Sequence, residues 1–502
     1  MNETNKKYSR EIVVTSVMIF TFLGKILGFF KELILAYYYG AGDISDAYLI
    51  SQTIPGTLFL IIGTGVATCY VPTYIAIKRS SGKNSSELFT NKFITVVVCI
   101  SLVLTLLLEI APGRFVKLFA IGFNENAFSL AVSFTRINGI SLVLSGLLYC
   151  FSGLLQAEKK YQYVAISNIP YNIGLVVAIV IGAYTSVNCL AFVSVLAVAL
   201  QLGFLWLFVR KIPYYYKPSF AFKDENLKKT LTFLPSVLLG VAATEINTLI
   251  DRTLASTIIA GGITLISYGT SLFNLVIGVF SHSVSSIYYP LISEASLSNN
   301  KQKFNRTVDS AIYTAIYFLL PCTIGIIILR EPIVKMLFGH GEFGLSHVNT
   351  LSSVLACYSL GFVPFALKQI LNNVYYSFGR TTKPMINTVV SVLINIVLNV
   401  ILSYFIGISG LALATSISAV LVAILLVRDY VKDFDGGIIS EKIHKIIVLA
   451  ICSFIMGMVC YFLNIRLENS FLLIIIKIGL SAIVYVGLSC ILKVCPISAK
   501  MY

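Results

Sequence analysis

The feature that most constrains this chain is a series of long apolar stretches that recurs from one end to the other. A helix needs about 20 mostly apolar residues to cross the hydrocarbon core of a bilayer. Stretches of this kind number fourteen in the 502-residue chain. They lie near residues 12–38, 46–75, 93–111, 128–156, 162–184, 187–209, 231–256, 263–291, 308–329, 348–377, 384–405, 409–427, 446–464 and 470–492. The pattern predicts an all-α polytopic membrane protein.

The composition agrees with this fold class. Charged residues make up 12% of the chain and hydrophobic residues 57%, whereas about a quarter of the residues in soluble domains are charged. Such a chain cannot be a soluble enzyme, a nucleic-acid binder or a disordered scaffold. Its net charge of +15 therefore needs an explanation other than a nucleic-acid partner.

The distribution of Lys and Arg over the loops supplies that explanation. If the N-terminus is inside, 26 of the 37 basic residues fall in loops on that side and five on the other. Cytoplasmic loops of membrane proteins carry this excess, and their bases contact anionic lipid headgroups. We therefore expect both termini in the cytoplasm.

Motifs for catalysis, metal binding or nucleotide binding are missing from the sequence. Nearly all of the ten Cys lie in apolar runs, and the four His are scattered without a partner at ligand spacing. The sequence contains no HExxH, GxSxG or GK[ST] motif. We expect no firm metal site and no ATPase or hydrolase chemistry.

Two segments recur in the same sense at nearly one offset. Lys31-Glu32 aligns with Asp251-Arg252 at an offset of 220, and Asn172-Ile173 with Asn395-Ile396 at an offset of 223. Six predicted spans separate the copies, which indicates two six-helix lobes related by an axis along the membrane normal. The predicted organisation is an N-terminal lobe over 1–222, a C-terminal lobe over 223–430, and two further helices with a cytoplasmic tail over 431–502.

Charged residues inside predicted spans need a reason, because each costs about 2.5–3.5 kcal/mol at the bilayer centre. Charged helices from both lobes would line a water-filled central cavity suited to an amphipathic anion such as a lipid diphosphate. The last two helices would wall a groove for its tail or simply pack. The alternative is that the charges form structural ion pairs. The candidate substrate-binding residues are Lys25, Lys31, Glu32, Asp46 and Arg252.

With these residues identified, the chain resembles the MurJ/MviN lipid II flippases of the multidrug/oligosaccharidyl-lipid/polysaccharide exporter superfamily. The likeness covers roughly residues 12–430. It rests on Gly24-Lys25 with Lys31-Glu32, Ser45-Asp46-Ala47-Tyr48, Thr135-Arg136-Ile137, Asn172-Ile173-Gly174, Asp251-Arg252, Leu337-Phe338-Gly339-His340-Gly341, Pro364 with Lys368, and Asn395 with Asn399 and Thr415-Ser416.

The resemblance implies a fourteen-helix transporter of the bacterial plasma membrane. It would alternate access without ATP and flip undecaprenyl-pyrophosphate-linked peptidoglycan precursor (lipid II) to the outer leaflet. Membrane potential or Na⁺ would drive it, with no other cofactor. A cation site implied by the family falls on Asp251, Asn395, Asn399 and Thr415, where Asn399 replaces a carboxylate. The alternative is that the paired Asn side chains hydrogen-bond between helices.

The sequence departs from the family at three basic positions. Phe59 and Ser271 stand where bases are usual, and Thr53 replaces a third. We therefore keep export of another lipid-linked oligosaccharide, for capsule or exopolysaccharide, as an alternative to lipid II. A cation-coupled drug antiporter is a less favoured alternative, because it would not need the last two helices. A membrane glycosyl- or acyltransferase is also less favoured, because it would carry a His, Asp or Glu cluster in a long loop, whereas the loops of this chain are short and lack one. The prediction is a transporter rather than an enzyme, with a lipid-linked glycan and membrane lipids as partners and no nucleic acid.

Overall fold

The computed structural model describes residues 3–212, 214–220, 245–298, 300–434, 443–463 and 470–496. These residues form helices and no strand, and a further helical segment covers 245–258. The helices are α1 (Glu3–Tyr39), α2 (Asp43–Gly65), the π-helical turn η1 (Val66–Tyr70), α3 (Val71–Ser80), α4 (Gly82–Ile110), α5 (Pro112–Phe119), α6 (Glu125–Gly139), α7 (Ser141–Ala157), α8 (Tyr161–Ile166), α9 (Asn168–Tyr184), α10 (Val187–Val209), α12 (Gly262–Leu297), α13 (Lys301–Phe338), α14 (Leu345–Ser359), α15 (Phe362–Ser377), α16 (Thr382–Ile406), α17 (Ile408–Phe434), α18 (Ile443–Phe462) and α19 (Ser470–Ile491).

Most of these helices are long and apolar enough to cross a membrane. Within the described residues there are eleven such helices, or twelve if the bent pair α6 and α7 is one span. This confirms the all-α polytopic membrane class. Of the other two expected spans, the first is covered by α1, and residues 231–244 of the seventh lie outside the described residues. The count of fourteen stays a prediction.

The chain divides into two compact units, residues 1–264 and 265–502. The predicted lobe boundary between residues 222 and 223 lies outside the described residues, so the predicted domain organisation stays a prediction. The two units are described separately below.

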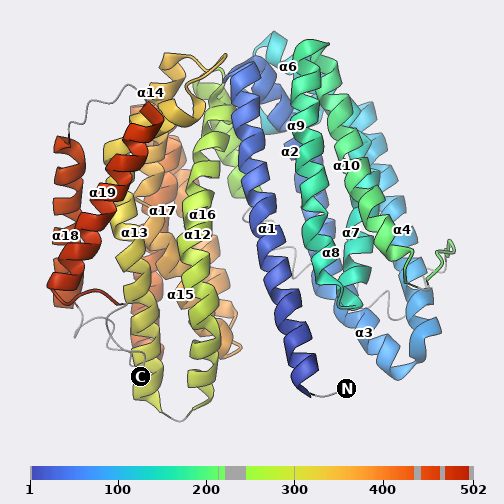
Figure 1. Cartoon of the computed structure of the whole chain (residues 1–502). Helices are drawn as coiled ribbons and strands as arrows, with labels where there is room; N and C mark the ends of the chain where they lie inside the picture. Colours follow the sequence, from blue (N-terminus) through green and yellow to red (C-terminus); the bar gives the residue numbers. More distant parts are fainter. Residues whose placement is uncertain are drawn as a thin grey trace. The chain divides into compact units, whose positions relative to one another are not determined.

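In the first unit, α7 packs against α2 and α4, while α10 packs against α6, α7 and α9 (Figure 1). Glycines on α7 allow these close approaches. A Cβ on Gly146 would lie 2.6 Å from Ser101 Oγ, and one on Gly153 would lie 2.5 Å from Val66. Small residues at helix contacts are typical of membrane proteins, because packing rather than the hydrophobic effect holds the helices together.

Two of the spans in the first unit are irregular. The helices α6 and α7 meet at a bend of 43°. The helix α2 continues through η1 into α3, which has Pro72 in its first turn. A single π-helical turn inserts one extra residue into the helix and shifts the side chains that follow.

In the second unit, α13 packs against α14, α15, α18 and α19, and α16 packs against α17 (Figure 1). Helix α18 packs against α13 through an apolar cluster, while hydroxyl groups fix α19 and the residues after it to α13. The Tyr313 hydroxyl donates to the carbonyl of Val494, and the Tyr485 hydroxyl donates to the carbonyl of Tyr317 at 2.8 Å. The Tyr317 hydroxyl also lies 3.1 Å from Ser489 Oγ.

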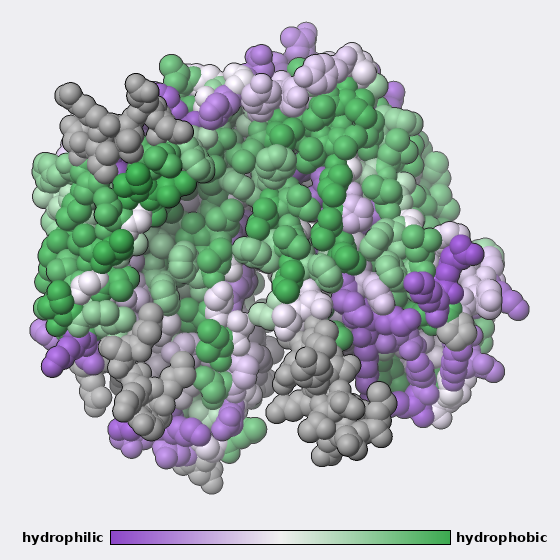
Figure 2. Space-filling model, viewed as in Figure 1, coloured by the Kyte–Doolittle hydropathy of each residue, from purple (hydrophilic) through white to green (hydrophobic). Residues whose placement is uncertain are grey.

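Figure 2 shows apolar side chains along the middle of the helices and hydrophilic side chains toward their ends. On α16, for example, Leu393, Val397 and Val400 are more than half exposed. Exposed aliphatic side chains on a long helix fit contact with lipid, since a bilayer offers no penalty for them.

Candidate functional site

The candidate site begins with a buried ion pair near the end of α1. Lys31 Nζ lies 2.9 Å from Glu32 Oε1, and the two side chains are 13% and 12% exposed. Tyr48 on α2 and Tyr171 on α9 are electrostatic neighbours of Lys31. Removing either partner of an ion pair with so little water around it is costly, because the other charge would then stay buried without compensation.

Arg252, on the helical segment 245–258, belongs to the same site. Its electrostatic partners are the carboxylates of Glu32, Glu245 and Asp251. Glu245 in turn accepts a hydrogen bond from Thr57 Oγ1 on α2 at 3.4 Å. The structure therefore brings together three of the five predicted residues, Lys31, Glu32 and Arg252, although they are far apart in the sequence.

This arrangement is suited to reversible anion binding. The second carboxylate oxygen of Glu32 is buried and has no hydrogen-bond partner among the described residues. The charges of Lys31 and Arg252 are balanced by carboxylates of the protein itself. A ligand phosphate could replace those carboxylates as the partner of both bases, and Arg offers it a bidentate contact.

Lys25 is not part of this cluster in the described structure. Its side chain is exposed. The glycines on either side of it, Gly24 and Gly28, face α9, and Asn172 Nδ2 donates to the carbonyl of Gly24 at 3.3 Å. These two glycines therefore let α9 approach α1 closely.

Asp46 is buried, and its described contacts are with the chain itself. Its Oδ1 accepts hydrogen bonds from the backbone N–H of Thr264 at 2.8 Å and from Thr264 Oγ1 at 2.6 Å. These bonds satisfy the first turn of α12, where a helix has unpaired N–H groups. No described hydrogen bond joins Asp46 to Lys31 or Arg252, so a direct contact with substrate stays a prediction.

Three of the four predicted cation ligands lie together in the second unit. Asn399 Nδ2 donates to Asn395 Oδ1 at 2.9 Å, and Asn395 Nδ2 donates to Thr415 Oγ1 at 3.4 Å. The fourth, Asp251, belongs to the first unit and accepts from Asn247 Nδ2 at 3.5 Å. The amide oxygen of Asn395 already has a donor, and the described residues contain no group of three or more His, Cys, Asp and Glu able to hold a metal.

The three departures from the family's basic pattern are filled by neutral side chains. Phe59 is 2% exposed and stacks on Tyr149 with ring centroids 6.0 Å apart. Thr53 Oγ1 donates to the carbonyl of Leu49, while Ser271 lies half-buried on α12. A cation at position 59 would displace a packed aromatic contact.

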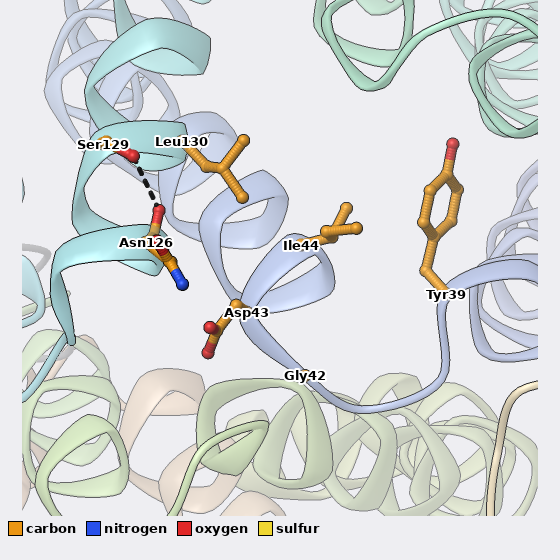
Figure 3. Close-up of a pocket in the computed structure, with 7 residues that line it drawn as sticks. All are labelled: Tyr39, Gly42, Asp43, Ile44, Asn126, Ser129 and Leu130. Atoms are coloured by element: carbon orange, nitrogen blue, oxygen red, sulfur yellow. Dashed lines mark hydrogen bonds between the residues drawn. The ribbon is translucent and has the colours of Figure 1, made fainter.

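A separate cavity of about 600 Å³ opens at the turn between α1 and α2 (Figure 3). Asp43 is its one charged lining residue and accepts from Asn124 Nδ2 at 3.0 Å. None of the five residues predicted to bind substrate lines this cavity. Its lining residues are Tyr39, Gly42, Asp43, Ile44, Asn126, Ser129 and Leu130.

The substrate-binding residues predicted from the sequence did not include the neutral neighbours of the cluster, Tyr48, Thr57 and Tyr171. The internal repeat could have indicated Tyr48, because Tyr268 occupies the equivalent position and both are fully buried. Thr57 and Tyr171 stand in apolar stretches without a pattern of their own, so only the packing of α2 and α9 identifies them.

Comparisons with known proteins identify the family of the chain. The family described as lipid II flippase MurJ matches residues 35–481. A probable lipid II flippase MurJ of Thermotoga maritima is 26% identical over 478 residues, which are 94% of this chain and 95% of that protein. A probable lipid II flippase MurJ of Vibrio cholerae is 27% identical, with 84% and 83% covered.

Solved structures show the same fold. The lipid II flippase MurJ in an inward closed conformation matches with a TM-score of 0.82 at 24% identity, over 95% of this chain and 98% of that one. An inward-facing multidrug resistance MATE family transporter matches with a TM-score of 0.69 at 15% identity, over 82% and 96%. Because the family match covers most of its length, this chain belongs to the MurJ family of lipid II flippases.

Proposed function

We propose that this protein flips lipid II, the undecaprenyl-pyrophosphate-linked peptidoglycan precursor, from the inner to the outer leaflet of the bacterial plasma membrane by alternating access. The observation that carries the proposal is the buried cluster of Lys31, Glu32 and Arg252 in a member of the MurJ family. In this proposal the protein is a transporter and not an enzyme, and both termini lie in the cytoplasm, as the 26 bases on that side indicate.

In the proposed mechanism the diphosphate of the substrate takes the place of the carboxylates. Lys31 and Arg252 bind its oxygens, and Glu32 holds the bases in position when the site is empty. Lys25, which is exposed on the same helix, contacts the headgroup. The polyprenyl tail stays in lipid, because about 0.8 kcal/mol per CH₂ opposes its transfer into a wet site.

The coupling is proposed to come from Na⁺ or from the membrane potential, with Asp251, Asn395, Asn399 and Thr415 as the cation ligands. Oxygen ligands suit a hard cation, and a carboxylate would strengthen such a site. Asn399→Asp should therefore increase the rise in melting temperature that Na⁺ causes, relative to choline. If Na⁺ stabilises neither protein, the site does not bind it and membrane potential remains as the driving force.

The proposal is tested by depleting the usual lipid II flippase of a bacterium and supplying this protein in its place. Survival and the exposure of lipid II on the outer leaflet are the measurements. We expect rescue by the natural sequence, loss of rescue with Lys31→Ala, and retention with Lys368→Ala, whose Nζ lies 6.0 Å from the Phe365 ring. Loss with Lys368→Ala but not with Lys31→Ala would contradict the assigned site.

A second candidate is export of a different lipid-linked oligosaccharide. The packed Phe59 and the neutral Ser271 favour it, because they make the site less positive than is usual in the family. Failure of rescue, with the protein shown to be in the membrane, would support this candidate over lipid II.

A further inference from the structure

The end of α10 and the segment after it form a basic and aromatic surface that the proposed transport does not use. Residues 204–220 contain Arg210, Lys211 and Lys217 and no Asp or Glu. All three bases are exposed. We call the set Trp206, Arg210, Lys211, Tyr215, Tyr216 and Lys217 the interfacial strip.

Hydrogen bonds fix the backbone of the strip to α4. Asn91 Oδ1 accepts from the Tyr214 hydroxyl at 2.6 Å and from the N–H of Lys217 at 3.2 Å. One turn further along α4, Thr95 Oγ1 lies 2.9 Å from the Tyr216 hydroxyl and accepts from the N–H of Ser219 at 3.2 Å. The strip is therefore held where the apolar part of α4 begins, the level at which we expect lipid to meet water.

The aromatic side chains of the strip are exposed, although the Tyr216 hydroxyl reaches Thr95 on α4. Tyr215 is 83% exposed, Trp206 is 46% exposed and Tyr216 is 42% exposed. Large exposed rings are unfavourable in water, but Trp and Tyr are enriched where a membrane meets water, because one part of each ring is polar and the rest is apolar.

One base of the strip lies over a ring of the strip, and a second lies over the neighbouring ring of Phe208. The Arg210 guanidinium is 4.5 Å from the centroid of Trp206, and Lys211 Nζ is 5.3 Å from the centroid of Phe208. More bases surround the strip, because the ends of α3, α7 and α10 share one hydrophobic cluster with Tyr214. Hydrophilic side chains gather over this part of the first unit in Figure 2. These neighbouring bases are Arg79, Lys159 and Lys160, while Lys78 at the same end is paired with Glu158.

We propose that the interfacial strip is a binding site for the headgroups of anionic phospholipids. The rings lie at the level of the lipid headgroups, and Arg210, Lys211 and Lys217 bind headgroup phosphates. Each base near an anionic membrane surface contributes about 1 kcal/mol. Zwitterionic lipids would gain the ring contacts but little of the charge interaction.

The chain contains one tryptophan, Trp206, so its fluorescence reports on the strip alone. The full-length protein is reconstituted in phosphatidylcholine vesicles with a fixed fraction of brominated phosphatidylglycerol or brominated phosphatidylcholine. Bromine quenches tryptophan on contact. We expect the anionic lipid to have an apparent binding constant about five times that of the zwitterionic lipid or more.

The variant with Arg210→Gln, Lys211→Gln and Lys217→Gln should lose this preference. The matched control changes Lys301, Lys303 and Arg306 of the second unit to Gln, which removes the same charge elsewhere and should keep the preference. Equal quenching by the two lipids in the natural protein would overturn the proposal. So would an equal loss in the control, because the preference would then reflect net charge and not the strip.

Discussion

At the scale of single residues, Lys159 has a left-handed backbone conformation, which is unfavourable for a residue with a Cβ. Its φ is +61°, at the turn between α7 and α8. The position 220 residues later, equivalent by the internal repeat, is Gly379 with a φ of +67°. A side chain with a Cβ pays about 1–2 kcal/mol in this conformation, whereas Gly pays almost nothing. One unit thus keeps a base at a position where the other has the residue that the backbone favours.

We expect Lys159→Gly to raise the free energy of unfolding by about 1 kcal/mol. The reverse change in the other unit, Gly379→Lys, should lower it by a similar amount. Both are measured by denaturant unfolding in detergent. A loss of stability with Lys159→Gly would show that contacts of the lysine outweigh its backbone strain.

Glu158, which precedes Lys159 in the chain, makes the free energy of unfolding depend on pH. Partial burial raises the pKa of its carboxyl, but hydrogen bonds from Lys78 and Tyr74 outweigh burial and hold the pKa below its usual value. A lowered folded pKa means that the stabilisation is present above the unfolded value of about 4.3 and is lost as the pH falls through the folded value. Glu158→Gln should therefore destabilise the protein at pH 7 and have much less effect once the pH has fallen below the folded pKa. An effect of equal size at both pH values would assign the stabilisation to packing.

Among the helices, α7 is one whose packing depends on small residues. A Cβ at position 146 would meet Ser101, Phe59 and Val97 within 3.2 Å, and one at position 153 would meet Val66 and Tyr70. By contrast, Gly203 on α10 has nothing within 4 Å. Helix α7 can approach α2 and α4 only because these positions lack side chains.

This contrast predicts opposite effects of one substitution. Gly146→Ala and Gly153→Ala should each lower the free energy of unfolding by about 1–3 kcal/mol, because the neighbours must move apart. Gly203→Ala should raise it by up to about 1 kcal/mol through helix propensity alone. The three proteins are compared by thermal unfolding in the same detergent. A stabilised Gly146→Ala protein would contradict the packing described for α7.

The sequence predicted the helices better than it predicted their shape. Apolar length identified spans because the bilayer imposes it. Each described span overlaps its predicted stretch, although α4 begins 11 residues before the stretch 93–111 and α13 extends 9 residues beyond the stretch 308–329. The bend between α6 and α7 and the π-helical turn at Val66–Tyr70 leave no mark on hydropathy. Likewise, the repeat indicated that the pair Lys31-Glu32 is equivalent to the pair Asp251-Arg252, but the partner of Asp46 depends on how distant segments pack.

At the scale of the whole molecule, Asp46 joins parts of the chain that are 218 residues apart. Its partner Thr264 is the last residue of the first compact unit. Because Asp46 is only 2% exposed, its carboxyl group depends on hydrogen bonds from the chain, and the backbone N–H and hydroxyl of Thr264 supply two of them.

We expect Thr264→Val, which removes only the hydroxyl, to lower the free energy of unfolding by about 1–3 kcal/mol, the usual value for a hydrogen bond to a charged group. Asp46→Asn keeps an acceptor for the backbone N–H and should be milder than Asp46→Leu. Thermal unfolding ranks the three variants. Equal stability of Asp46→Leu and the natural protein would show that the bonds to Thr264 do not matter.

The attachment of α19 to α13 also joins residues that are synthesised at different times. The hydroxyls of Tyr313 and Tyr317 bond to Val494 and Ser489, which a ribosome adds more than 170 residues later. An unpaired polar group in lipid is costly. Until α19 and the residues after it are synthesised, the hydroxyls of Tyr313 and Tyr317 lack these two hydrogen-bond partners. The nascent second unit is therefore unfinished until translation of its last turn, and a chain released early would expose those hydroxyls to the quality-control proteases of the cell.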